Sequence, residues 1–215
     1  MAAITQSLAV SGRAYYIVCG ISYGAAYMNL VHRWICRSAF WKNAVETKIL
    51  PWTLDGVDLG SQVLEIGPGP GITTDLIRTR VDHLTCVEID TALAESLSRR
   101  LDGRNVTVLN GDATSMPFPD ATFDAAVSFT MLHHVPSAEL QDRLLAEVAR
   151  VLRPGAVFAG TDSLYSRIFG LLHLFDTMIA VDPKSFPDRL QAAGFANIHV
   201  DVGSEAFRFR ATKAY

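Results

Sequence analysis

The chain has 215 residues, enough for one α/β domain with a sizeable buried core. The chain has a net charge of −3 and no run of basic residues, so its charge pattern does not predict binding to nucleic acid. Arg99 and Arg100 are accordingly interpreted as solvated edge residues. The three cysteines have neither disulfide-framework nor metal-ligand spacing, so we expect a reducing, cytoplasmic compartment and no metal.

The N-terminal region is the part of the sequence that is hardest to assign to a structure. Residues 14–31 carry no charge, but glycine, serine and asparagine dilute their apolar character. The segment therefore falls short of an integral membrane span, which needs about 20 mostly apolar residues. We expect residues 1–27 to be a weakly ordered extension, with Met28 as the natural start of a single domain over residues 28–215. A loosely helical tail and a targeting segment are the alternatives.

From residue 31 onward, helical and strand patterns follow one another. Residues 31–49 suggest one or two helices, and Pro51 is expected to break that pattern. Strands are predicted at 63–66, 83–87, 106–110, 125–129 and 156–160, and helices at 73–80, 91–101 and 138–152. Such alternation predicts parallel strands joined by right-handed crossovers, in a doubly wound α/β fold with helices on both faces of the sheet.

The last quarter departs from simple alternation. Apolar residues recur at three- and four-residue steps over 164–181, directly after the strand at 156–160. Because ligands of doubly wound folds bind beyond the carboxyl ends of the strands, we interpret 164–181 as a lid helix with an apolar inner face. Extra core packing is the alternative. A helix over 185–193 follows, and strands over 196–202 and 206–212 close the sheet.

The most informative stretch is residues 63–71, which read VLEIGPGPG. An apolar run with Glu65 near its end leads into Gly67, Gly69 and Gly71, which predicts a strand and then a turn where the backbone can approach a ligand. A dinucleotide site reads G-x-G-x-x-G instead, and the prolines in this loop remove two N–H donors. The loop therefore favours a nucleoside without phosphates. A nicotinamide-dependent oxidoreductase is the disfavoured alternative.

This loop resembles motif I of the class I S-adenosylmethionine-dependent methyltransferases, and further blocks follow in the order typical of that family. They are VEID at 87–90, GDA at 111–113, MPFPD at 116–120 with FDAAVS at 123–128, LHHV at 132–135 and EVARVLRPG at 147–155. Together they are similar to the small-molecule branch, which includes ubiquinone/menaquinone-biosynthesis-type enzymes. The resemblance implies S-adenosyl-L-methionine as cofactor. It also implies a seven-stranded, mostly parallel sheet with an antiparallel last strand.

The same resemblance assigns cofactor contacts to one end of the sheet. Glu65 would accept hydrogen bonds near the methionine end, directly or through water, while Gly67, Gly69 and Gly71 would let the ligand lie against the backbone. Glu88 follows Gly67 by 21 residues, close to the spacing expected of an acidic residue that binds a ribose.

The remaining contacts would surround the adenine and the amino group of the cofactor. Ile89 would pack on the adenine face, Asp112 would accept from the adenine amino group, and the Ala113 amide would read a ring nitrogen. The backbone carbonyl of Ser128, at the end of the strand over 125–129, would meet the cofactor's amino group.

The sequence assigns no catalytic residue. Methyl transfer mainly needs an aligned acceptor and exclusion of water, and a general base is required only for a hydroxyl acceptor. His134 is a weak candidate for that base and His133 a weaker one, the alternative being a structural role in the crevice wall. We expect methyl transfer to a small, apolar acceptor. A non-catalytic binding module with the same fold is the other alternative.

Overall fold

The computed structural model of the protein describes residues 34–166 and 178–215. The predicted extension over residues 1–27 lies outside these ranges, and so do residues 167–177 of the predicted lid. The described flanks of that lid, 164–166 and 178–181, contain no helix. The extension and the lid helix therefore stay predictions.

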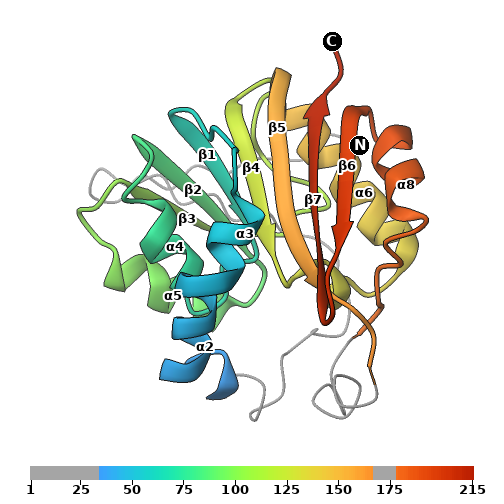
Figure 1. Cartoon of the computed structure of the whole chain (residues 1–215). Helices are drawn as coiled ribbons and strands as arrows, with labels where there is room; N and C mark the ends of the chain where they lie inside the picture. The colour runs from blue at the N-terminus through green and yellow to red at the C-terminus, as the bar shows by residue number, and fades with distance from the viewer. Residues whose placement is uncertain (1–33, 167–177) are drawn as a thin grey trace.

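One seven-stranded sheet forms the centre of the molecule (Figure 1), in the order β3-β2-β1-β4-β5-β7-β6. Neighbouring strands from β3 to β5 are parallel, whereas β7 is antiparallel to both β5 and β6. The predicted fold class, including the antiparallel last strand, is confirmed. The strands are β1 (Gln62–Ile66), β2 (His83–Glu88), β3 (Val106–Asn110), β4 (Phe123–Phe129), β5 (Leu152–Ser163), β6 (Phe195–Val202) and β7 (Ala206–Lys213).

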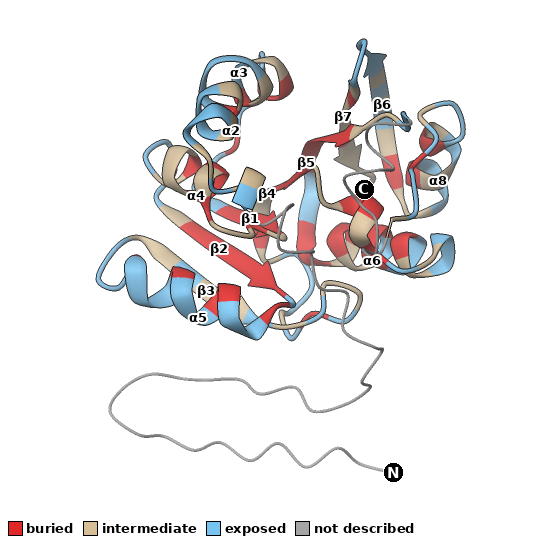
Figure 2. Cartoon of the chain, turned by 90° about the horizontal axis from the view of Figure 1, so that it is seen from below, coloured by how far each residue is buried: buried red, intermediate tan, exposed pale blue. Residues whose placement is uncertain are grey.

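Helices cover both faces of this sheet (Figure 2). Side chains alternate between the faces along a strand, so Ala125 and Val127 of β4 join one hydrophobic cluster and Ala126 joins the other. The first cluster includes residues of α3 and α4, and the second includes residues of α6 and α8. The helices that pack after the first strand are α4 (Ile72–Ile77), α5 (Thr91–Arg100), α6 (Ala138–Val151) and α8 (Phe186–Ala192).

The N-terminal helices differ from the prediction at Pro51. Three elements follow one another without a break: α2 (Ala39–Ala44), the π-helix η1 (Val45–Ile49) and α3 (Leu50–Thr53), which contains Pro51 in its first turn. Proline has no N–H and its ring collides with the carbonyl four residues earlier in a regular helix. The preceding π turn, in which the Leu50 N–H bonds to the Val45 carbonyl, widens the helix at this point. The helical stretch therefore continues past the proline instead of ending there.

The strand order reverses at β1, which has β2 and β3 on one side and β4 and β5 on the other. The carboxyl ends of these parallel strands meet at one edge of the sheet. The loops that leave this edge include residues 67–71 after β1, 89–90 after β2, 111–113 after β3 and 130–131 after β4. Ligands of open α/β sheets bind at such a switch point, and the predicted site residues lie on or beside these loops.

Candidate functional site

The glycine loop after β1 has the conformation that its sequence predicts. Gly67, Gly69 and Gly71 have φ values of +62°, +55° and +84°, in the left-handed region that favours glycine. A Cβ on Gly67 would collide with the side chain of Met131, and one on Gly71 would collide with Leu97. A Cβ on Gly69, in contrast, would have no described atom within 4 Å. Gly69 therefore faces open space within the described structure, at the edge where ligands bind.

Glu88, at the end of β2, holds this loop from one side. Its Oε2 accepts the Gly69 N–H at 2.9 Å, and its Oε1 accepts the Asp90 N–H at 2.9 Å. Burial raises the pKa of Glu88, and the hydrogen bonds from the backbone of Asp90 and Gly69 oppose that rise. The next residue, Ile89, is 61% exposed although it is large and apolar. The loop after β2 thus places a carboxylate and an uncovered apolar side chain beside Gly69.

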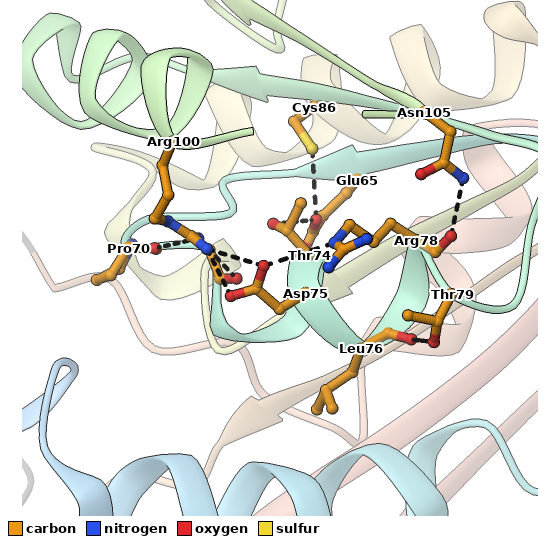
Figure 3. A network of polar contacts seen from close by, with 11 residues as sticks. Glu65, Pro70, Thr74, Asp75, Leu76, Arg78, Thr79, Cys86, Arg100 and Asn105 are labelled. Atoms are coloured by element: carbon orange, nitrogen blue, oxygen red, sulfur yellow. Dashed lines mark hydrogen bonds and ion pairs between the residues drawn. The ribbon is translucent and has the colours of Figure 1, made fainter. Parts of the chain in front are cut away.

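Glu65 lies beneath the loop rather than at its surface (Figure 3). Its buried carboxylate accepts hydrogen bonds from the hydroxyls of Thr73 and Thr74 in the first turn of α4 and from the Cys86 thiol. Burial raises the pKa of Glu65, and the threonine hydroxyls counter part of the effect. Burial and the neighbouring Glu65 also raise the pKa of the Cys86 thiol well above its ordinary value. In this structure the Glu65 carboxylate anchors the first turn of α4, and its contact with the cofactor, directly or through water, stays a prediction.

Asp112 and Ala113 follow β3 at the same edge. The Asp112 side chain is exposed and its Oδ1 accepts the Thr114 N–H at 2.8 Å, which shapes the turn. Ala113 is partly buried against the hydrophobic core. Sequence reasoning missed Asn110, whose side-chain amide donates to the Glu88 carbonyl at 2.9 Å and so fastens the end of β3 to the end of β2.

Ser128 lies near the end of β4, as the sequence predicts. It is fully buried and is paired with Ile66 of β1 and Gly160 of β5, and the contact of its carbonyl with the cofactor stays a prediction. β4 continues to Phe129, and Thr130 then adopts a left-handed conformation with φ of +48°. This turn leads to Met131, whose side chain lies against Gly67. The residue after β4 that contacts the glycine loop is therefore Met131, which sequence reasoning missed.

The two histidines after β4 occupy different environments. His133 is buried, and both its backbone N–H and its ring Nδ1 bond to the carboxylate of Asp162, at the end of β5. His134 is only partly buried, and the two rings lie 4.2 Å apart between centroids. Asp162, itself fully buried, carried no motif that could have identified it. His134 is thus the more accessible of the two candidate bases.

The turn that carries these histidines is fastened to the described C-terminal end of the predicted lid, residues 178–181. The Ile179 N–H donates to the His133 carbonyl at 2.7 Å. Buried Gln141 of α6 donates to the carbonyls of Leu132 and Ile179, at 3.0 and 2.9 Å.

In residues 34–166 and 178–215, no group of three or more acidic, histidine or cysteine side chains could hold a metal ion. Across the same ranges, no helix has the length and apolar character to cross a bilayer.

Residues 64–160, which carry β1 to β5 and their loops, match the family model described as a methyltransferase domain. This segment of the chain is therefore similar to the class I S-adenosylmethionine-dependent methyltransferases, as the order of its motifs predicts. The match covers the loop with Gly69, the carboxylate of Glu88 and the turn with both histidines. The site assembled at the carboxyl edge of the sheet therefore lies within the segment that matches the methyltransferase domain.

Two curated methyltransferases are similar to this chain. A fatty-acid O-methyltransferase of Mycolicibacterium smegmatis is 37% identical over 106 residues, which are 48% of this chain and 38% of the relative. The chloroplastic 2-methyl-6-phytyl-1,4-hydroquinone methyltransferase 2 of Oryza sativa subsp. japonica is 27% identical over 190 residues, which are 85% of this chain and 52% of the relative. The chain thus spans about half the length, or less, of these relatives.

A solved structure with the same fold is the PH0226 protein from Pyrococcus horikoshii OT3. It superimposes with a TM-score of 0.68 at 18% sequence identity, over 83% of this chain and 93% of that chain. At this identity the likeness establishes the fold of the chain and nothing finer.

Proposed function

We propose that this chain binds S-adenosyl-L-methionine at the carboxyl edge of β1 to β4 and transfers its methyl group to a small, apolar acceptor. The observation that carries the proposal is the open space over Gly69, bordered by the Glu88 carboxylate and by exposed Ile89. A nucleoside without phosphates needs this combination: close approach to backbone, an acceptor for ribose hydroxyls and an apolar surface for the base.

The residues fit the cofactor in their chemistry. A carboxylate has about four lone-pair sites, and the backbone N–H groups of Gly69, Asp90 and Ile89 act on that of Glu88, which leaves room for a ribose hydroxyl. Ile89 would cover the adenine face. Asp112 would accept a hydrogen bond from the adenine amino group, and the Ala113 amide would donate one to a ring nitrogen. Pro68 and Pro70 have no N–H to offer a pyrophosphate, which disfavours a nicotinamide dinucleotide.

Glu65 would accept hydrogen bonds near the methionine end of the cofactor, directly or through water, and the Ser128 carbonyl would meet the cofactor's amino group. Glu65 fixes the first turn of α4 and thereby the glycine loop, and Ser128 supports the strand from which Met131 emerges. The cofactor supplies an electrophilic methyl group on a sulfonium, so the chain's own task is to align the acceptor and exclude water. Where the acceptor is a hydroxyl, His134 would take its proton, beside the His133–Asp162 pair.

An apolar acceptor is supported by side chains at the same edge. Tyr165 follows β5 and is largely exposed, and Ile179, partly exposed, is bonded to the histidine turn. Both lie within the predicted lid over 164–181, one near each of its ends. The names of the two relatives point to lipid-like acceptors, a fatty acid and a phytyl hydroquinone. We accordingly place the protein in the cytoplasm, acting on a small molecule and not on nucleic acid.

The test is transfer of a radiolabelled methyl group from S-adenosylmethionine to a panel of long-chain fatty acids and prenylated hydroquinones, with RNA and DNA as comparison acceptors. Label in an apolar acceptor alone supports the proposal. Label in nucleic acid would contradict the acceptor class. Cofactor binding with no transfer to any member would favour the non-catalytic module.

A further inference from the structure

The glycine loop is held from a second side by the end of α5 (Figure 3). Arg100, the last residue of that helix, donates through Nη1 to both carboxylate oxygens of Asp75, at 2.8 and 2.7 Å. Its Nη2 lies 3.2 Å from the Pro70 carbonyl and 3.4 Å from the Gly71 carbonyl and donates to both. The side chain of Arg100 is 43% exposed, as expected of an edge residue, and it also bridges α5, α4 and the loop.

Arg100 contacts the glycine loop at a point where the residues of the loop offer few hydrogen bonds of their own. Gly71 is the N-cap residue of α4, and no side chain caps the helix there. Pro68 and Pro70 cannot donate backbone hydrogen bonds. A Cβ on Gly71 would lie 2.3 Å from Leu97 and 2.6 Å from the Arg100 guanidinium, so the end of α5 is pressed directly against the loop.

Two clamps thus flank the open position at Gly69. On one side Glu88 accepts the Gly69 N–H, and on the other Arg100 donates to the two carbonyls that follow it. A loop fixed before binding loses less conformational freedom when the ligand arrives, which increases affinity. The Arg100 guanidinium contacts the loop and Asp75, so its effect on a ligand would pass through the loop.

We propose that Arg100 is a positioning residue for the cofactor: its fork holds the loop 67–71 in the conformation that binds S-adenosylmethionine. This inference rests on the proposed cofactor site. Loss of the fork should weaken cofactor binding about 3- to 10-fold, a modest factor because the Arg100–Asp75 pair is partly exposed to solvent. The rate at saturating cofactor should change little, since the loop reaches the same conformation once the ligand is bound.

The chain supplies a matched control in the neighbouring residue. Arg99 lies on the same helix, carries the same charge and pairs only with Glu95 of that helix among its described ion pairs, at 3.3 Å. Arg100→Met and Arg99→Met therefore change the charge equally, but only the first removes a contact with the loop. Asp75→Asn and the double variant with Arg100→Met complete a cycle in which the two losses should not add.

The experiment is calorimetric titration of each full-length variant with S-adenosylhomocysteine, with thermal unfolding to verify the fold. The expected result is a 3- to 10-fold weaker dissociation constant for Arg100→Met and a value within 2-fold of the parent for Arg99→Met. Equal affinity in the two variants would overturn the inference. If the parent itself binds no S-adenosylhomocysteine, it is the proposed function that fails, before any variant is compared.

Two further readouts separate positioning from a general loss of stability. With an accepted substrate, Arg100→Met should raise KM for the cofactor while kcat stays within 2-fold; a fall in kcat alone would contradict the proposal. Arg100→Lys keeps the charge but replaces the planar fork with one ammonium group, so it should restore affinity only in part. Full recovery in the lysine variant would mean that charge alone acts, and would refute the role of the fork. This variant also provides the test should Arg100→Met fail to fold.

Discussion

Replacement of Gly69 by alanine separates the conformational role of a glycine from its role in leaving space. Gly69 has φ of +55°, and a Cβ there would meet no described atom within 4 Å. Gly103, in the turn between α5 and β3, has φ of +74° and an equally uncrowded Cβ position among the described atoms. An L-residue in this region costs about 1–2 kcal/mol. Both alanine variants should therefore lose about the same free energy of unfolding, which corresponds to roughly 2–8 °C in Tm for a chain of this size.

The two variants should differ in their affinity for the cofactor. In Gly69→Ala the new methyl group would occupy space that we assign to the ligand, and overpacking of this kind costs about 1–3 kcal/mol, or roughly 5- to 150-fold in affinity. In Gly103→Ala the dissociation constant for S-adenosylhomocysteine should match the parent's. Thermal unfolding by circular dichroism and calorimetric titration measure the two effects separately. Equal affinity in both variants would refute the assignment of the space over Gly69 to the cofactor.

Three other perturbations follow from the same geometry. Glu88→Ala should weaken S-adenosylhomocysteine binding by about 1–3 kcal/mol in calorimetry because a buried charged acceptor is lost; parental affinity would disprove the ribose assignment. Burial raises the pKa of Glu65, so the stability linked to this group is present below its ordinary pKa of 4.5 and is lost as pH rises through the raised value. Glu65→Gln should remove that loss, worth about 1.4 kcal/mol per unit of pKa rise, and flatten the fall of the urea unfolding free energy as pH rises above 4.5; an unchanged slope would contradict it. Gly160→Ala would place a Cβ 2.4 Å from the Ser128 carbonyl and 2.6 Å from Phe209, so we expect a loss of about 3 kcal/mol or more in thermal unfolding, and a loss below 1 kcal/mol would be inconsistent with the packing between β4, β5 and β7.

The fold could be predicted because its signals are local. Strand alternation, the glycines of residues 67–71 and the acidic residue ending β2 each depend on a few neighbouring residues. The prediction that Pro51 breaks the helix also rested on local sequence. It was wrong because the π turn of η1 accommodates the proline, and that turn has no sequence signature. Some observed strand ends differ from the predicted ones by a few residues. β5, for example, was predicted to start at residue 156 but begins at Leu152, which pairs with Phe123.

The site was harder to predict because its decisive contacts join distant residues. Nothing near Asp162 in sequence indicates that it holds His133, and nothing near Arg100 indicates the Pro70 carbonyl. Glu65 illustrates the opposite case. Its position in the motif was recognised, but only the packed structure places its carboxylate under α4, on Thr73 and Thr74.

The most direct test of the account is calorimetric titration of the full-length chain with S-adenosylhomocysteine, with NAD as the comparison ligand. The account predicts saturable binding of S-adenosylhomocysteine at one site, with a dissociation constant of about 1–100 µM, or roughly −8 to −5.5 kcal/mol. It predicts no heat of binding for NAD. Absence of S-adenosylhomocysteine binding to the folded protein, or binding of NAD in its place, would contradict the central claim.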